Sequence, residues 1–163
     1  MRESIQKNRV PFSFGANWQG YVRKALTPER IDDAVDSLRS FLGAVSLKEK
    51  TLLDIGCGSG LFSLAARKLG ARVHSFDCDP LSVRCTEELK RHYFPNDDKW
   101  TIERGDVLDV NYLNTLGHYD MVYSWGVLHH SGSMWKALEN VIPLVGEDGR
   151  LFLSIYNDEG RKV

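Results

Sequence analysis

The sequence has no long apolar run, few cysteines and almost no net charge. No apolar stretch is long enough to span a bilayer, and the N-terminal MRESIQKNRVPF has no signal-peptide core. The three cysteines, Cys57, Cys78 and Cys85, are an odd number at spacings that match no zinc motif. We therefore expect neither a disulfide scaffold nor a metal site, and we expect a cytoplasmic protein. A net charge of −1 gives no overall attraction to nucleic acid or to an anionic membrane.

The chain is long enough for one domain with a real core. It has 163 residues, of which 42% are hydrophobic and 26% charged, as in ordinary globular proteins. Residues 1–11 are polar, and we expect them to be a mobile N-terminus. Residues 12–157 are expected to form the single domain, with an N-terminal cap and helix at 12–43 and a sheet core at 50–157. Residues 158–163 are then a short tail.

Strand-like and helix-like segments alternate along the chain. Ile31, Val35, Leu38 and Leu42 recur at helical spacing after a Thr27-Pro28 start signal. The pattern predicts an α/β fold: a doubly wound, Rossmann-like, mainly parallel sheet with helices on both faces. The carboxyl ends of its strands share one edge, where ligands bind. The predicted strands are 51–55, 72–77, 100–106, 119–125 and 150–156, and the predicted helices are 28–42, 61–70, 80–93, 109–116 and 134–145.

The stretch LLDIGCGSG, residues 52–60, carries the main functional signal. Its spacing, G-x-G-x-G, departs from the dinucleotide fingerprint G-x-G-x-x-G. A carboxylate at Asp54 would also repel a pyrophosphate, by roughly 4 kcal/mol at an intermediate dielectric. A ligand with a cationic end and no phosphate removes the conflict, and S-adenosylmethionine (SAM) is such a ligand. Asp77, which closes the second strand, could accept hydrogen bonds from the ribose hydroxyls of either ligand. Its alternative role is a helix N-cap, but Asp79 before Pro80 is better placed for that.

These segments, in this order, resemble the motifs of class I SAM-dependent methyltransferases, and in particular the small-molecule group of the quinone-biosynthesis type. The resemblance rests on LLDIGCGSG, SFDCDP, GDVLD and YDMVYSWGVLHH, and on FGANWQGY followed by LTPERI. It implies a SAM cofactor, with S-adenosylhomocysteine (SAH) as product. The acidic residue and the glycine loop would wrap the methionine moiety, and an aromatic near Trp18 or Tyr21 would close the pocket. The cofactor-binding residues implied are Trp18, Arg30, Asp54, Gly56, Cys57, Gly58, Gly60, Asp77, Cys78, Asp106, Val107, Ser124 and Trp125.

Two adjacent histidines, His129 and His130, follow the fourth predicted strand. One of them could act as general base on a substrate hydroxyl, since the unperturbed pKa of histidine is near 6.5. Loop packing is the alternative; a metal site is disfavoured because adjacent side chains point apart. His74 and His118 have no evident partners in the sequence, and we expect both at the surface.

The acceptor is less well specified. An N-P-P-Y sequence after the fourth strand would indicate methylation of nitrogen atoms in bases or side-chain amides. SWGV stands in its place, so we expect the acceptor to be a hydroxyl oxygen or carbon of a small molecule. A SAM-binding module without turnover and an NAD-dependent oxidoreductase are the alternatives. Relative to the full methyltransferase fold we expect a C-terminally truncated sheet. Its exposed edge, residues 150–157, could then form a homodimer.

Overall fold

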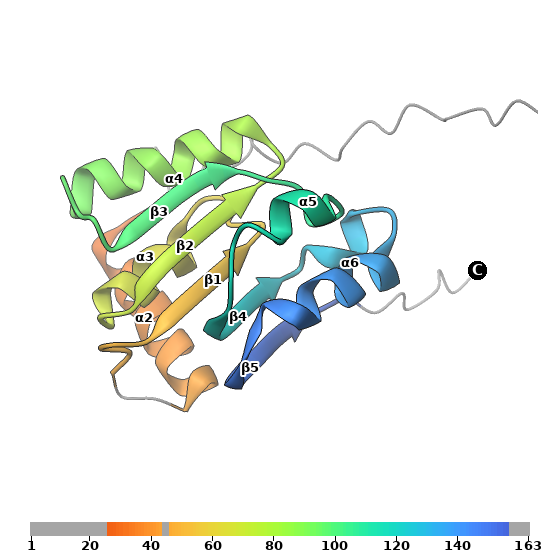
Figure 1. Ribbon diagram of the computed structural model, residues 1–163. Helices are drawn as coiled ribbons and strands as arrows, with labels where there is room; N and C mark the ends of the chain where they lie inside the picture. Colours follow the sequence, from red (N-terminus) through yellow and green to blue (C-terminus); the bar gives the residue numbers. More distant parts are fainter. Residues whose placement is uncertain (1–25, 44–45, 157–163) are drawn as a thin grey trace, which may run out of the picture.

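The computed structural model describes residues 26–43 and 46–156, and its centre is a five-stranded parallel sheet (Figure 1). The strand order is β3-β2-β1-β4-β5, and all four pairs of neighbouring strands are parallel. The predicted α/β class with a parallel sheet is therefore confirmed. The strands are β1 (Thr51–Ile55), β2 (Arg72–Asp77), β3 (Trp100–Arg104), β4 (Tyr119–Trp125) and β5 (Val145–Ser154).

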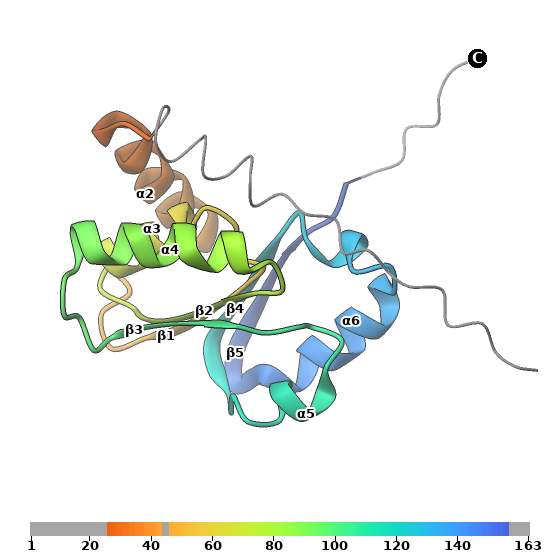
Figure 2. The same ribbon diagram turned by 90° about the horizontal axis from the view of Figure 1, so that it is seen from above.

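Helices cover both faces of the sheet, as Figure 2 shows. On one face lie α2 (Pro28–Leu42), α3 (Leu61–Lys68) and α4 (Pro80–Tyr93). On the other lie α5 (Val110–Leu113) and α6 (Met134–Val141), over the half of the sheet that contains β4 and β5. Two short 3-10 helices, η1 (Leu128–His130) and η2 (Ile142–Leu144), flank α6.

Local sequence signals explain where the helices begin and end. Thr27 caps α2 by accepting a hydrogen bond from the Arg30 N–H, and Gly43 ends it in a left-handed conformation. Asp79 caps α4 by accepting from the Leu81 N–H at 2.8 Å. That leaves the Asp77 carboxylate available for another role.

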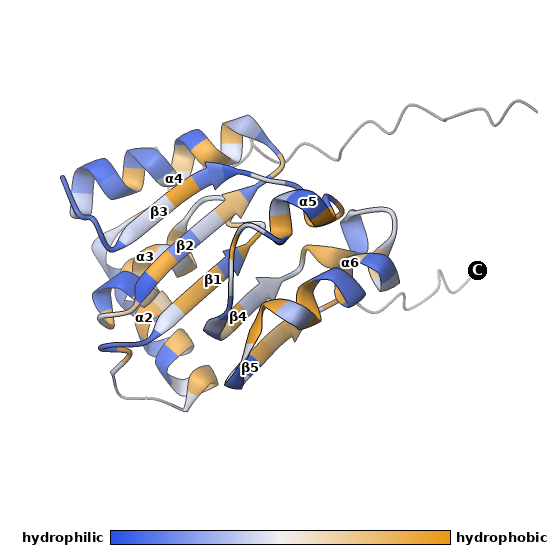
Figure 3. Ribbon diagram, viewed as in Figure 1, coloured by the Kyte–Doolittle hydropathy of each residue, from blue (hydrophilic) through white to orange (hydrophobic). Residues whose placement is uncertain are grey.

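The core is divided into two layers by the sheet. One layer packs α2 and α3 onto β1 and β2 around Leu38, Leu64 and Trp100; the other packs α6 under β1 and β4 around Leu53, Val122 and Leu128. Hydrophobic residues mark much of β1 and β5, whereas much of α4 is hydrophilic (Figure 3). Because both faces of the sheet are packed, the strand ends are held in place and the loops at one edge can carry functional residues.

The last helix and strand differ from the sequence prediction. The predicted helix 134–145 ends as an α-helix at Val141, because Pro143 has no N–H to donate and its ring clashes with the preceding turn. The fifth strand therefore begins at Val145, not at residue 150, with a register irregularity opposite Tyr119 and Met121. The third strand ends at Arg104, two residues earlier than predicted.

The prediction that His74 is a surface residue without partners is wrong. Its Nδ1 lies 2.8 Å from the Tyr119 hydroxyl and its Nε2 lies 2.9 Å from Glu103 Oε1. These partners come from β4 and β3, so the pairing depends on strand order, which local sequence does not reveal. His118 is exposed, as predicted.

Candidate functional site

The turn between β1 and α3 can be made only with glycines. Gly56, Gly58 and Gly60 all have left-handed φ values, of +74°, +56° and +80°. A Cβ on Gly56 would lie 2.5 Å from the Val127 side chain, and one on Gly60 would lie 2.9 Å from the Thr86 backbone Cα. The turn therefore combines an unusual backbone with close neighbours on two sides.

Asp77 ties the end of β2 to this glycine turn. Its Oδ2 accepts a hydrogen bond of 3.0 Å from the Gly58 N–H, and its Oδ1 accepts one of 2.9 Å from the Asp79 N–H. Burial nonetheless raises the pKa of this carboxyl above its usual value, against the lowering effect of those two N–H groups. The carboxylate is thus held in place at the carboxyl edge of the sheet.

Asp54 is a second carboxylate beneath the same turn. Its side chain is only 3% exposed and accepts a hydrogen bond of 2.5 Å from the Ser63 hydroxyl on α3. Burial raises its pKa to about 7, the Ser63 hydrogen bond opposes this, and the charge of Asp77 adds to it. Two neighbouring carboxylates in a buried setting make this region favourable for a cation.

The residues after β2 and β3 lie close to these carboxylates. Cys78 is exposed as a residue, but its thiol is partly shielded from solvent. This shielding, together with the charges of Asp77 and Asp106, raises the pKa of the thiol to about 11, so it is inert at neutral pH. Asp106 accepts a hydrogen bond of 2.9 Å from the Leu108 N–H. Val107 is buried, and its carbonyl accepts from the Asn140 side chain at 3.0 Å.

Aromatic side chains gather at the end of β4. Trp125 is 44% exposed and stacks on Tyr123, with ring centroids 5.9 Å apart and planes 7° from parallel. Phe41 from α2 meets the Trp125 ring edge-on at 4.8 Å and is 45% exposed. The sequence did not single out Phe41, because its helical position gives no sign of a contact with β4. Ser124 is buried and donates to the Ile55 carbonyl at 3.3 Å, so it joins β4 to the end of β1.

His129 and His130 lie in η1, which follows β4. Their ring centroids are 4.0 Å apart, and Tyr156 lies 4.7 Å from the His129 ring. Among the residues that the structure describes, neither ring nitrogen of His129 has a hydrogen-bond partner, although both are buried. Burial, with a smaller contribution from His130, lowers the pKa of His129. A neutral imidazole with unused nitrogens can accept a proton. Tyr156 was also missed by the sequence analysis.

Two predicted cofactor residues are not among those that the structure brings to this group. Trp18, with its alternative Tyr21, lies outside the described residues. Arg30 lies in the first turn of α2, and the neighbouring Asp32 pairs with Lys68 at 3.7 Å. Because Lys68 is at the opposite end of α3 from the glycine turn, the structure does not bring Arg30 to Asp54. Its contact with a ligand stays a prediction.

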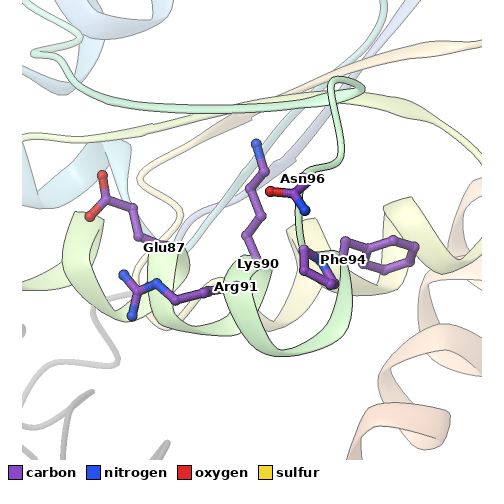
Figure 4. Close-up of a pocket in the computed structure, with 6 residues that line it drawn as sticks. Glu87, Lys90, Arg91, Phe94 and Asn96 are labelled. Carbon is purple, nitrogen blue, oxygen red and sulfur yellow. The ribbon is translucent and has the colours of Figure 1, made fainter.

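Two cavities lie away from this group of residues. A cavity of about 460 Å³ lies at the end of α4, lined by Glu87, Lys90, Arg91, Phe94, Pro95 and Asn96 (Figure 4). Its Lys90 ammonium donates to the Trp100 carbonyl, at the start of β3. A smaller cavity of about 300 Å³ lies beside Tyr119 and Asp120, at the start of β4. Both are at the amino edge of the sheet, away from the glycine turn, so we assign the functional site by its chemistry and not by cavity size.

The described residues contain no group of three His, Cys, Asp or Glu side chains that could hold a metal ion. None of the helices described is long and apolar enough to cross a membrane.

Comparison with a protein-family profile gives one match, over residues 27–162, to a family described as "Methyltransferase domain". A curated relative, protein arginine N-methyltransferase 1 of Chlamydomonas reinhardtii, is 32% identical over 99 residues, which are 57% of this chain and 28% of that protein. This chain therefore spans less than a third of that relative's length.

Solved structures show the same fold. A SAM-dependent methyltransferase from Aquifex aeolicus superimposes with a TM-score of 0.66 at 17% identity, over 88% of this chain and 76% of that one. The magnesium protoporphyrin IX methyltransferase of Synechocystis, crystallised with SAM, gives a TM-score of 0.63 at 19% identity, over 82% of this chain and 67% of that one. At these identities the likeness establishes the fold.

Proposed function

The chain belongs to the methyltransferase domain family, and from that premise we propose that it is a SAM-dependent methyltransferase acting on a hydroxyl oxygen or carbon of a small molecule. SAH is the product that leaves the site. Within the described part of the chain the ring nitrogens of His129 have no hydrogen-bond partner, which favours a protein that turns over, in preference to a module that only binds SAM.

One observation carries the proposal: two carboxylates from adjacent strands converge on one glycine turn. Asp54 lies beneath the turn, and Asp77 is bonded to its Gly58 N–H at 3.0 Å. A pyrophosphate at this turn would face the negative charge of Asp54, which argues against NAD. A ligand with an ammonium, a sulfonium and a ribose matches both carboxylates, because its cationic end balances Asp54 while its ribose hydroxyls donate to Asp77.

The surrounding residues fit such a ligand. Gly56 and Gly60 let the turn pack closely against Val127 and Thr86, and this packing holds the turn in position between the two carboxylates. The exposed face of Trp125 can attract a sulfonium by a cation–π interaction of about 1–2 kcal/mol when the ligand is desolvated. Asp106 and the Val107 backbone follow β3 where an adenine would lie in such a site.

When bound, SAM supplies an electrophilic methyl group on a positively charged sulfur. The chain's own residues then need to hold the acceptor in line with that methyl and to exclude water. For a hydroxyl acceptor, His129 or His130 takes the proton as the new O–CH₃ bond forms and the S–CH₃ bond breaks, leaving SAH as a neutral thioether. A carbon acceptor would release its proton to the same base.

Two observations support the small-molecule acceptor. SWGV, which ends β4 and begins the next loop, brings no carboxylate or amide that could orient an amine, and the Synechocystis relative is named for a small-molecule acceptor. The Chlamydomonas relative is named for a protein acceptor, so the test includes both kinds. We further propose a cytoplasmic location, since Cys57, Cys78 and Cys85 are all free thiols.

Two measurements test the proposal. Calorimetry with SAM, SAH and NAD should show binding of the first two and not of NAD; the reverse would favour an oxidoreductase. SAH release is then followed with hydroxylated small molecules, carbon acids and arginine-containing peptides. Binding without release with every acceptor would favour a SAM-binding module, and release only with peptides would overturn the small-molecule acceptor.

A further inference from the structure

A buried chain of hydrogen bonds ends at the Asp54 carboxylate. The Trp100 indole Nε1 donates to Ser75 Oγ at 3.0 Å, Ser75 Oγ lies 2.7 Å from Ser63 Oγ, and Ser63 Oγ donates to Asp54 Oδ2 at 2.5 Å. All four side chains are buried. The chain crosses from β3 through β2 and α3 to β1, so it links the edge of the sheet to the glycine turn.

The direction of this chain is fixed by chemistry. An indole N–H can only donate, so Ser75 accepts from Trp100. Ser63 has a single hydroxyl proton, and it points to Asp54, so Ser63 must accept the Ser75 proton. Each donor is therefore aimed toward Asp54, and successive bonds of this kind polarise one another. Such a chain stabilises a carboxylate more than a neutral carboxyl group.

We propose that Ser63, oriented by Ser75 and Trp100, is a positioning residue for ligand binding: it orients the Asp54 carboxylate beneath the glycine turn and favours its ionised form against burial, ready for the ammonium end of a ligand. This inference rests on the proposed function, because SAM and SAH supply that ammonium. It adds three residues, from α3, β2 and β3, that a motif-based reading of the ligand site leaves out.

The other titratable groups around Asp54 either repel its negative charge or are neutral. Asp77 on β2 repels it, and so would a thiolate at Cys57 in the glycine turn. The Tyr123 hydroxyl on β4 is kept neutral, partly by the charge of Asp54 itself. Burial raises the pKa of Asp54, while Ser63 lowers it. Removing the Ser63 hydroxyl should therefore shift Asp54 toward its neutral form in the neutral pH range.

A purely structural role for the chain makes a different prediction. If Ser63 only stabilised packing, its loss would weaken all ligands of the site alike. If it sets the charge of Asp54, the loss should be confined to ligands that carry the ammonium. SAH and 5′-methylthioadenosine separate these cases, since both contain adenosine and a thioether but only SAH has the amino-acid end.

The experiment measures dissociation constants of both ligands by calorimetry from pH 6 to 8 for wild type, Ser63→Ala, Ser63→Thr and Ser75→Ala. At pH 7 we expect Ser63→Ala to weaken SAH about tenfold, the size expected for a hydrogen bond to a charged group, and to leave 5′-methylthioadenosine unchanged. The midpoint at which SAH affinity falls with decreasing pH should move upward. Ser63→Thr keeps the hydroxyl and should restore binding, and Ser75→Ala should shift the midpoint less than Ser63→Ala.

A second readout does not depend on the ligand. NMR titration of the Asp54 carboxyl carbon in the ligand-free protein should give a higher midpoint in Ser63→Ala than in wild type. An unchanged midpoint, or equal weakening of both ligands, would overturn the inference. A wild type that binds no SAH would contradict the proposed function and the ligand part of this inference, and the titration would still decide whether Ser63 sets the charge of Asp54. If Ser63→Ala does not fold, Ser75→Ala gives the same comparisons.

Discussion

The main-chain N–H of Gly58 donates a hydrogen bond of 3.0 Å to the carboxylate of Asp77. One end of this bond is in the turn after β1 and the other is the last residue of β2. The bond fixes the distance between the glycine turn and the group that we assign to the ribose. Asp77 therefore shapes the site as well as offering acceptor atoms to a ligand.

Replacing Asp77 should weaken cofactor binding, and by more when both the charge and the acceptor atoms are removed. Asp77→Asn keeps an acceptor for Gly58 but loses the charge, whereas Asp77→Ala loses both. Two charge-assisted hydrogen bonds of about 1.5–3 kcal/mol each are at stake, so calorimetry should show SAH weakened at least tenfold in Asp77→Asn and more in Asp77→Ala. Asp79→Ala is the control, since it removes the neighbouring carboxylate that caps α4 and leaves the Asp77 carboxylate in place. Unchanged affinity in Asp77→Ala would remove Asp77 from the site.

Adding a side chain to the glycine turn should abolish binding without unfolding the protein. Gly58→Ala forces a Cβ onto a left-handed residue at +56°, at a cost of roughly 1–2 kcal/mol. Gly117→Ala is the matched control, since its φ is +77° and nothing lies within 4 Å of the added Cβ. Both variants should lose a similar amount of thermal stability, and only Gly58→Ala should lose SAH binding. Normal binding by Gly58→Ala would mean that the turn has only a structural role.

The sequence predicted the elements well where the signal was local. Thr27, Pro28 and Gly43 bracket α2, and the alternation of strand and helix was sufficient for the parallel sheet. The boundary of β5 was missed because Pro143 ends α6 early and the chain then returns to the sheet at once. Periodicity alone does not show how soon a chain re-enters a sheet.

The site was predictable only in part. The glycines and the carboxylates at strand ends could be found because a parallel sheet gathers those ends at one edge. Phe41, Tyr156 and the Trp100–Ser75–Ser63 chain could not, because each contact joins elements that are far apart in sequence. A buried serine in a helix carries no sign of the carboxylate that it will meet.

Stability should depend on pH through Asp54. Its pKa is about 7 in the folded protein against 3.8 ordinarily, so the folded state favours the protonated form. Below about pH 4 this preference contributes fully to the free energy of unfolding, and the contribution is lost as the pH rises through about 7. The contribution of Asp54 to the free energy of unfolding therefore changes by an amount on the order of 4 kcal/mol. Asp54→Asn has no charge to bury and can still accept from Ser63. Thermal unfolding should show the variant gaining several degrees over wild type at pH 8 and little at pH 4. A difference that does not change with pH would contradict this.

Methyl transfer to a hydroxyl acceptor should depend on a neutral histidine after β4. Burial lowers the pKa of His129 below the usual value for histidine, which favours the neutral ring that a general base needs. We expect His129→Ala to reduce kcat about 100-fold or more and to leave SAH affinity unchanged, as for loss of a general base. His118→Ala, at an exposed position, is the control. If His130→Ala alone loses activity, the base is His130. Full activity in both variants would exclude a histidine base.

The exposed edge of β5 should support association between copies of the chain. Within the described sheet, β5 pairs on one side only, with β4, which leaves the backbone groups of its other side free to pair. The Phe152 ring packs against Phe41, with ring centroids 5.3 Å apart, so its side chain is not free for a partner. Ile155, the residue after the end of the strand, is 47% exposed. We expect light scattering over a concentration series to show a dimer, and Ile155→Lys to shift it to the monomer by placing a charge at the edge. Ile142→Lys, at a 56% exposed position in η2, is the matched control and should leave the dimer intact. A wild-type chain that stays at 18.5 kDa at high concentration would refute an interface at this edge.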